Sequence, residues 1–312
     1  MAQPVLIDTD SGVDDALAII LALRSPEIRV EAITTVAGNV EVDKCTANIS
    51  FLLELLQPVS RPTLAQGASR PLRRKLFTAP EVHGKDGLGN FRGNRQRIRP
   101  PRISAVRAIL DACDRFEKRL VVVALGPLTN IARAFLHRPS SLRKVGRLIS
   151  MGGALRVPGN TGPVAEFNYF VDPEAARIVL HSGLPVTMVP LDVTEQLVLM
   201  RNEVEYRAQR RASRIAKAIL RFTDFYMKYH KKTEGFYGGY MHDPLAMAIA
   251  IDPSLVSMRK MRIDVETRGV LTRGMTVAIS EKNQKQHRGT VNVPMKVDRE
   301  RFFKLFHERL WM

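Results

Sequence analysis

Four aspartates lie within eight residues near the start of the chain: Asp8, Asp10, Asp14 and Asp15. Asp14 and Asp15 fall in the first turn of an expected helix, where acids compensate the helix dipole. That effect explains one or two carboxylates, but not four that converge on one strand-to-helix turn. Closely packed carboxylates repel, so some must take up protons or share a cation. Oxygen ligands suit Ca²⁺ or Mg²⁺, so the cluster predicts a metal site.

The elements around the cluster alternate between expected strands and helices. Strands are expected at 4–8, 29–36, 120–125, 147–150 and 185–190, and helices at 13–24, 42–56, 128–136 and 173–181. This alternation predicts an α/β fold, one domain over residues 1–312, with a mainly parallel, Rossmann-like sheet flanked by helices. Residues 66–102 are expected to form a long loop. Further on, a helical pattern runs from 201 to about 229, a hairpin is expected within 257–279, and an amphipathic helix at 298–310.

Polar or glycine residues follow several of these strands where each one ends. Asp8 and Asp10 follow the first strand, and Gly38 and Asn39 follow the second. Gly126, the residues 151–153 and Asp192 follow later strands. Ligands of parallel α/β sheets bind at the carboxyl ends of the strands, so we expect the active site at this edge.

The formal net charge of +17 comes mainly from two segments. Residues 70–102 hold ten Lys and Arg against two acids, and residues 201–232 hold ten against three. A basic surface attracts polyanions but does not select one of them. The simpler alternative is that both basic segments form ordinary solvent-exposed surfaces with no polyanionic partner. Only Cys45 and Cys113 are present, and no basic leader precedes an apolar run. These features favour a cytoplasmic protein without a membrane span.

The first motif alone fits more than one class of enzyme. An apolar strand followed by Asp-x-Asp also resembles the haloacid dehalogenase phosphatases, whose first Asp is the nucleophile. That hypothesis requires a later Lys and an acidic pair after another strand, and no convincing match for them is found.

Seven motifs in order resemble the inosine-uridine type nucleoside hydrolases over roughly residues 4–280. They are DTDSGVDDALAI (8–19), TTVAGNV (34–40), HGKDGLG (83–89), ALGPLTNIA (124–132), MGGA (151–154), AEFNYFVDPEAARIVL (165–180) and HDPLAMAIAIDP (242–253). Each motif is weak alone, but seven in this order are specific. The resemblance implies calcium-dependent hydrolysis of the N-glycosidic bond of ribonucleosides, in purine or pyrimidine salvage. It also implies a homo-oligomer, a dimer or a tetramer.

The resemblance further implies site residues. Asp10, Asp15 and Asp243, with the Leu125 carbonyl, would bind Ca²⁺. Asp10 would also be the general base that takes a proton from water beside the metal. The implied ribose-binding residues are Asp14, Asn39, Met151 and Asn168, with Asn160 and Glu166 at the 5′-hydroxyl. Asp8 remains as a structural support of the turn.

The leaving base needs a proton or a hydrogen bond. His242, directly before Asp243, is the natural candidate, and the alternative is a histidine that only caps the helix that follows. His83 is a second candidate, with a plain loop histidine as its alternative.

Two segments, about 77–90 and 222–240, match the mobile lids that contact the base in this family. Candidates for contacting the base in the second segment are Phe222, Tyr226, Tyr229, His230, Glu234, Tyr237 and Tyr240. The aromatic ones could stack on a nucleobase, and they could equally pack in the core or in the lid. Purine or pyrimidine preference stays open. The basic segments overlap both lids, so the positive charge is expected to rim the pocket mouth. Alternative functions are a nucleotide N-ribosidase, which Glu166 disfavours, and a non-catalytic nucleic-acid-binding protein, which an intact ligand set disfavours.

Overall fold

A computed structural model describes residues 2–91, 101–279 and 290–311. Part of the basic segment 70–102 and the end of the loop at 66–102 therefore lie outside the described residues. The strands are β1 (Gln3–Thr9), β2 (Ile28–Thr35), β3 (Thr63–Gln66), β4 (Val121–Ala124), β5 (Arg147–Met151), β6 (Val186–Val189), β7 (Val198–Met200), β8 (Gly238–Tyr240), β9 (Val256–Val265), β10 (Thr276–Ala278) and β11 (Thr290–Val297).

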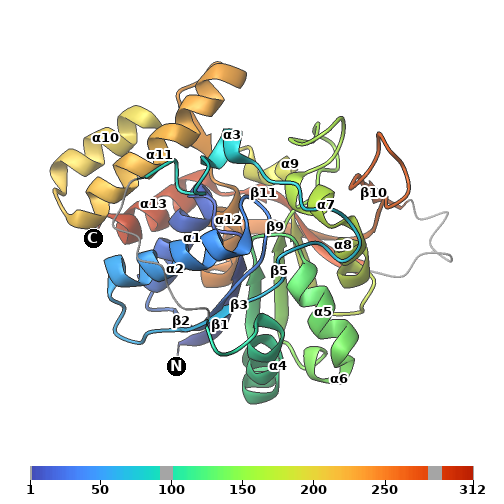
Figure 1. Cartoon of the computed structure of the whole chain (residues 1–312). Helices are drawn as coiled ribbons and strands as arrows, with labels where there is room; N and C mark the ends of the chain where they lie inside the picture. Colours follow the sequence, from blue (N-terminus) through green and yellow to red (C-terminus); the bar gives the residue numbers. More distant parts are fainter. Residues whose placement is uncertain (1, 92–100, 280–289, 312) are drawn as a thin grey trace.

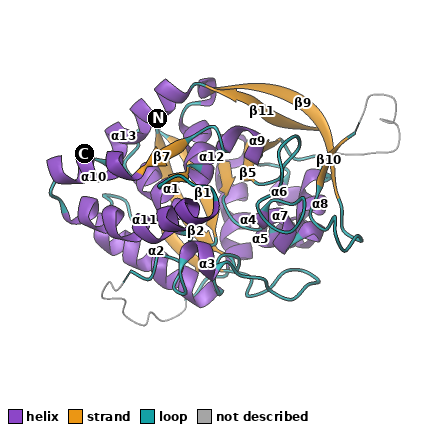
Figure 2. Cartoon of the chain, turned by 90° about the horizontal axis from the view of Figure 1, so that it is seen from above, coloured by secondary structure: helices purple, strands orange, loops and turns teal. Residues whose placement is uncertain are grey.

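The helices surround these strands on both faces (Figures 1 and 2). They are α1 (Val13–Leu23), α2 (Val42–Leu56), α3 (Pro80–His83), α4 (Ala105–Phe116), α5 (Thr129–His137), α6 (Pro139–Leu142), α7 (Phe167–Val171), α8 (Pro173–Leu180), α9 (Leu191–Thr194), α10 (Arg201–Arg210), α11 (Arg214–Thr233), α12 (His242–Ile251) and α13 (Arg299–Leu310), with short 3₁₀ turns at Glu117–Arg119 and Pro253–Leu255.

The central sheet has the strand order β10-β9-β11-β6-β5-β4-β1-β2-β3. Every pairing from β3 across to β11 is parallel, whereas β9 pairs antiparallel with both β11 and β10. The predicted α/β fold with a mainly parallel sheet is confirmed, as is the late hairpin. β11 was not predicted, and it inserts between β9 and β6. Its Pro294 adjoins a register shift, which is where an inner strand tolerates proline.

Alternating side chains of the inner strands supply two hydrophobic cores, one on each face of the sheet. Val5 and Ile7 of β1 pack in the core under α1, α2, α11, α12 and α13. Leu6 points to the opposite core, under α4, α5 and α8. Strands buried on both faces are mostly apolar, which explains the apolar runs of the sequence. In the part of the chain that the structure describes, no helix is long and apolar enough to cross a membrane.

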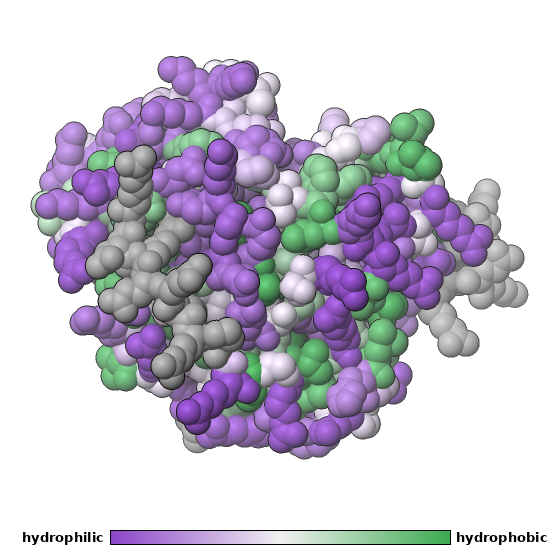
Figure 3. Space-filling model, viewed as in Figure 1, coloured by the Kyte–Doolittle hydropathy of each residue, from purple (hydrophilic) through white to green (hydrophobic). Residues whose placement is uncertain are grey.

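The carboxyl ends of the parallel strands lie at the end of the sheet where α3, α9 and α11 gather (Figure 1). A second sheet of two antiparallel strands, β7 and β8, connects the helices at this end. Most of the face seen in Figure 3 is hydrophilic, with smaller apolar patches between the polar side chains. The fold therefore places the ends of β1, β2, β4 and β5 beneath α3 and α11.

Candidate active site

Asp10 lies directly after β1 and is fully buried. Its Oδ2 accepts a hydrogen bond of 2.7 Å from the backbone N–H of Asn39. Its Oδ1 has no hydrogen-bond partner among the described residues. A Cβ at Gly38 would lie 2.1 Å from Oδ2, and a Cβ at Gly126 would lie 2.8 Å from Oδ1. Both positions must therefore be glycine for the loops after β2 and β4 to close around this carboxylate.

Asp14, Asp15 and Asp243 come together at the same point. Each offers a carboxylate oxygen, and these atoms lie within 4.8 Å of one another, so the three could hold a metal ion. Asp15 accepts hydrogen bonds from the Thr9 hydroxyl and from the Gly12 N–H, which fixes its orientation at the start of α1. The N–H of Asp243 donates to Asp14 Oδ2 at 3.4 Å. This group includes Asp14 and omits Asp10, in contrast to the ligand set that the family resemblance implies.

The raised pKa values of this cluster indicate that no positive charge balances its carboxylates. Burial, with repulsion from Asp15, raises the pKa of Asp14 to about 8. The same two causes raise the pKa of Asp10 well above its usual range. Burial and the charges of Asp14 and Asp15 do the same to the pKa of Asp243. A divalent cation would offset both the repulsion and the burial cost, so the donor set fits a hard metal ion.

Asp8 lies outside this group, although it is adjacent in sequence. Its Oδ1 accepts hydrogen bonds from the Thr34 hydroxyl at 2.6 Å and from the Asn130 amide at 2.8 Å. Asn130 Nδ2 also donates to the carbonyl of Thr35. Asp8 thus joins β1, β2 and α5 beneath the site, which is the supporting position expected for it.

The Asn168 amide joins the ends of two strands. Its Nδ2 donates to the carbonyl of Leu125, after β4, at 2.7 Å and to the carbonyl of Met151, at the end of β5, at 3.2 Å. A carbonyl oxygen has two lone pairs, so the Leu125 carbonyl could still accept a second partner. These contacts hold the ends of β4 and β5 beside Asp10.

Glu166 caps α7 and is buried. Its Oε1 accepts from the N–H of Asn168 at 2.8 Å, and its Oε2 accepts from Gly153 at 3.0 Å and Tyr169 at 3.2 Å. Burial raises the pKa of Glu166 to about 7, although these backbone bonds oppose the shift. Asn160 supports the same helix, because its Oδ1 accepts from the N–H of Phe167 at 2.9 Å.

His242 begins α12, and its side chain does not cap that helix. Instead its Nδ1 lies 2.7 Å from the Thr194 hydroxyl at the end of α9. His83 is buried at the end of α3, where its Nδ1 accepts from the N–H of Val13 at 3.1 Å. Burial lowers the pKa of both histidines to about 3. Since Nδ1 of a neutral His83 accepts, its Nε2 carries the hydrogen and can donate.

One cavity of about 340 Å³ joins these groups, a volume within the range of small-molecule pockets. Of the residues expected in the site, it is lined by Asp14, Asn39, His83, Leu125, Met151, Asn160, Glu166, Asn168, His242 and Asp243. Both expected lid segments contribute, through Phe77 to His83 and Tyr226 to Tyr240. Asp10 and Asp15 are fully buried and do not line the cavity. Asn39, which lines it, donates hydrogen bonds to both carboxylates at the end of the cavity that we call its floor.

Five of the expected base-contact residues line the cavity: Tyr226, Tyr229, His230, Glu234 and Tyr240. The other two lie elsewhere. Phe222 is fully buried in the core, and the Tyr237 hydroxyl donates to Asp224 at 2.7 Å. The rings that remain are packed together, with Tyr226 stacked on His83 at 5.6 Å between ring centroids.

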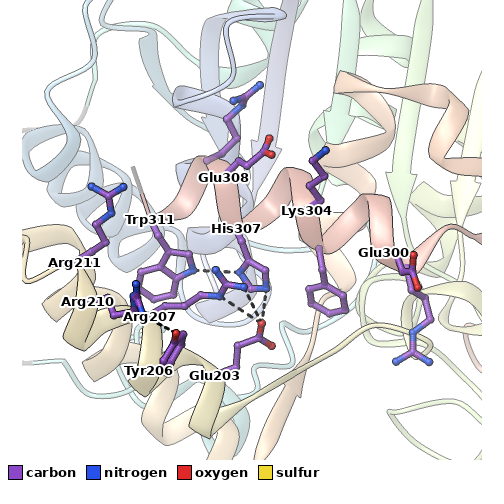
Figure 4. A pocket seen from close by; sticks show the side chains of 13 residues that line it. Glu203, Tyr206, Arg207, Arg210, Arg211, Glu300, Lys304, His307, Glu308 and Trp311 are labelled. Atoms are coloured by element: carbon purple, nitrogen blue, oxygen red, sulfur yellow. Dashed lines mark hydrogen bonds and ion pairs between the residues drawn. The ribbon is translucent and has the colours of Figure 1, made fainter.

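The basic residues of α10 do not rim this cavity, contrary to expectation. Arg207, Arg210 and Arg211 line a separate groove against α13. In this groove Glu203 pairs with both Arg207 and His307 (Figure 4). Among the described residues that line the 340 Å³ cavity, none is Lys or Arg. The positive charge of α10 is therefore separated from the candidate active site.

Some residues of the site fall in none of the sequence motifs. Thr161 and Glu195 line the cavity outside the motifs and the expected lids, and Thr194 contacts His242 without lining the cavity. Phe77 and Glu81 were expected only as part of the lid segment 77–90. They lie on loops and short helices, where no hydrophobic periodicity marks a position. Glu195 directly follows the short helix α9, so only the three-dimensional fold brings it to the cavity.

Comparisons with known proteins agree with this geometry. The profile described as "Inosine-uridine preferring nucleoside hydrolase" matches residues 5–304, further along the chain than the resemblance expected to about 280. A pyrimidine-specific ribonucleoside hydrolase RihA of Enterobacter sp. (strain 638) is 38% identical over 99% of this chain and 98% of its own length.

Two solved structures have the same fold over nearly their whole length. The plant nucleoside hydrolase PpNRh1 superposes with a TM-score of 0.94 at 35% identity, covering 100% of this chain and 99% of its own. A purine-preferring ribonucleoside hydrolase from Gardnerella vaginalis gives 0.90 at 34% identity, covering 98% of each chain. These matches leave no support for a haloacid dehalogenase-like phosphatase or a non-catalytic protein. The chain belongs to the inosine-uridine preferring nucleoside hydrolase family and is an N-glycosyl hydrolase of ribonucleosides.

Proposed function

We propose that this enzyme is a calcium-dependent hydrolase that releases ribose and free base from nucleosides and not from nucleotides. The observation that supports this most directly is the cavity itself. It joins a buried carboxylate cluster to an aromatic end, and its described lining contains no Lys or Arg that could pair with a phosphate.

Calcium is the metal that best fits the donor set. Asp10, Asp15 and Asp243, with the Leu125 carbonyl, would hold it. All four are oxygen donors, which Ca²⁺ prefers, and Asp10 Oδ1 lacks a partner among the described residues. When bound, the cation would supply positive charge that lowers the pKa of water and grips sugar hydroxyls.

Asp10 would act as the general base. The N–H of Asn39 holds Oδ2, which leaves Oδ1 to take a proton from the attacking water. Water then attacks the anomeric carbon directly, with inversion, as in inverting glycosidases. Asp14, Asn39 and Asn168 would hold the ribose hydroxyls and Met151 would pack against the ring. The anionic oxygens of the floor would stabilise the positive charge of the ribosyl transition state.

His83 and His242 would assist the leaving base. Both are neutral at physiological pH because burial lowers their pKa. They would therefore act as hydrogen-bond donors rather than as a source of imidazolium. Tyr226 stacks on His83 and so orients it toward the cavity that both residues line.

Glu166 and Asn160 would meet the 5′-hydroxyl, and this predicts discrimination against a 5′-phosphate. A phosphate beside a buried carboxylate costs several kcal/mol, so kcat/KM for UMP should be at least about 100-fold below that for uridine. Steady-state ribose release measures both. 5′-O-Methyluridine is the matched control, since it adds bulk without charge and should lie between the two. UMP turnover equal to or faster than uridine turnover would overturn the assignment in favour of a nucleotide N-ribosidase.

The remaining proposals concern the enzyme in the cell. We propose a homo-oligomer, a dimer or a tetramer, by resemblance to the family. A cytoplasmic place in nucleoside salvage fits Cys45 and Cys113, which are both buried and unpaired. The named relatives include a pyrimidine-specific and a purine-preferring enzyme, so we assign no base preference.

A further inference from the structure

The groove between α10 and α13 lies apart from the candidate active site (Figure 4). Its volume is about 1320 Å³, and it shares no described lining residue with the cavity above the aspartates. Its charged lining residues, apart from one histidine, are six Lys or Arg and three Glu: Arg207, Arg210, Arg211, Arg299, Lys304 and Arg309, with Glu203, Glu300 and Glu308. The groove therefore has an excess of positive charge that nucleoside hydrolysis does not use.

Four of these cations are exposed and have no ion pair with a described carboxylate: Arg210, Arg211, Arg299 and Lys304. Their neighbour Arg207 differs, because it pairs with Glu203 at 3.3 Å. Exposed cations without partners are available to an anionic ligand from solution.

The helix dipoles do not account for all of these charges. A cation near the carboxyl end of a helix is favoured, which explains Arg210 and Arg211 at the end of α10. Arg299, however, is the first residue of α13, where the dipole disfavours a cation. Lys304 lies in the middle of the same helix, where the dipole has little effect. A ligand that attracts all four cations is needed to explain why they line one groove.

An exposed aromatic ring lies beside the cations. The Tyr206 ring is 57% exposed, and the guanidinium of Arg210 lies over it at 5.4 Å from the ring centroid. Arg210 Nη1 also donates to the Tyr206 hydroxyl at 2.8 Å, which fixes the two side chains relative to each other. Proteins that bind single-stranded nucleic acids combine these two features, since bases stack on exposed rings while cations contact the phosphates.

Contacts between the two helices fix the walls of the groove. His307 Nε2 of α13 lies 2.8 Å from Glu203 Oε1 of α10. Trp311 Nε1 donates to His307 Nδ1 at 3.3 Å, and the Phe303 ring stacks on His307 at 5.6 Å between centroids (Figure 4). The cations are therefore held on a preformed surface, which lowers the entropy cost of binding a ligand.

A second copy of this chain does not fit the groove. In a two-fold contact through this surface, the positive excess would face itself. Among the described residues that line the groove, only Tyr206 is a largely exposed hydrophobic side chain, so little apolar area could offset the repulsion. The net charge of +17 adds repulsion between whole molecules. The charge of the groove instead complements a polyanion.

We propose that the groove between α10 and α13 binds single-stranded RNA or DNA. The four unpaired cations would contact phosphates, and Tyr206 would stack on an unpaired base. Neither contact reads the identity of a base, so binding is expected to be largely independent of sequence. The inference goes beyond the proposed function and does not depend on it, because the groove and the cavity are separate.

The test is the fluorescence anisotropy of a labelled oligothymidylate of about twelve nucleotides, a length within the range of single-strand sites. At about 100 mM salt we expect a Kd on the order of 10 µM. Because four cations would displace counterions, the logarithm of the affinity should fall with the logarithm of the salt concentration with a slope of about −3.

Two variants separate the charge from the ring. The double variant Arg210→Gln with Arg211→Gln should weaken binding at least about tenfold and make the salt slope shallower by about 1. Tyr206→Leu should weaken binding at least about fivefold and leave the salt slope unchanged. The matched charge control is Arg115→Gln with Arg119→Gln, two exposed arginines outside the groove, and it should bind like the parent.

All of these variants should release ribose from uridine at the rate of the parent, and thermal melting shows that each one folds. No binding of the oligothymidylate, or an equal loss of affinity in the groove variants and in the charge control, would overturn the inference. An oligoglutamate that competes as well as unlabelled oligothymidylate would assign the groove to acidic peptides instead. Tighter binding of a DNA duplex than of the single strand would also contradict the proposal.

Discussion

Replacing Asp10 by asparagine is expected to lower kcat for ribose release from uridine by about 10³-fold, within the range for loss of a general base. Asparagine has nearly the same shape as aspartate, so the close approach of Gly38 and Gly126 remains possible. It can accept one hydrogen bond from the Asn39 N–H but cannot take a proton from water. The loss should therefore appear in kcat, while the thermal midpoint changes little or rises as repulsion falls.

Asp8→Asn is the matched control for this variant. Asp8 is equally buried and two residues away, but its Oδ1 is held by Thr34 and Asn130 beneath the site. Burial raises its pKa to about 7, so a neutral amide resembles the carboxyl that the fold already favours. Its kcat should stay close to that of the parent. Near-normal turnover by Asp10→Asn, or an equal loss in Asp8→Asn, would show that Asp10 is not the base.

Replacing Asp243 by asparagine should raise the calcium concentration for half-maximal activity on the order of 100-fold, since charged ligands set calcium affinity. Asp243 lies in α12, far from Asp14 and Asp15 in the sequence, and it completes the group of three carboxylates. Activity at low calcium should be lost, and high calcium should restore part of it. A calcium titration of ribose release measures the shift.

The same substitution should stabilise the metal-free protein. An acid whose pKa is raised in the folded state costs stability once the pH rises above its unfolded value, and this cost disappears as the pH falls. The pKa of Asp243 is raised well above its usual range by burial and by Asp14 and Asp15. Asparagine removes this cost, so without calcium the thermal midpoint at pH 8 should rise. Addition of calcium should raise the thermal midpoint of the variant by less than it raises that of the parent enzyme. A lower midpoint without calcium, together with unchanged calcium dependence, would contradict a role in the metal site.

Many of the strands and helices were predictable because local sequence patterns determine them. The helix at Val42–Leu56 was predicted with its observed bounds, and β1 and α1 differ by one or two residues. Strands buried on both faces leave strong apolar runs, as in 120–125. β11 was not predicted because TVNVPMKV contains a proline, which argues against an inner strand. Only its neighbours β9 and β6 make it an inner strand.

The site was predictable only where motifs mark it. Asp243 was assigned by family resemblance, since nothing local connects it with Asp15. Glu195, Glu81 and Thr194 lie on short helices or turns and reach the site through the tertiary fold. For the basic segment 201–232, the sequence predicted positive charge at the cavity, and the fold places the arginines elsewhere. The end of this segment reaches the cavity through Tyr226, Tyr229 and His230, whereas Arg207, Arg210 and Arg211 line the groove against α13.

The most direct test of the central claim is the calcium dependence of ribose release from uridine. The enzyme is freed of metal with a chelator, and Ca²⁺ or Mg²⁺ is then added back in steps. We expect activity to fall by at least about 10³-fold without metal, because the floor loses the charge that grips the sugar and activates water. Calcium should restore it fully at lower concentration than magnesium, since the site offers many oxygens. Full activity after complete removal of calcium would contradict the account.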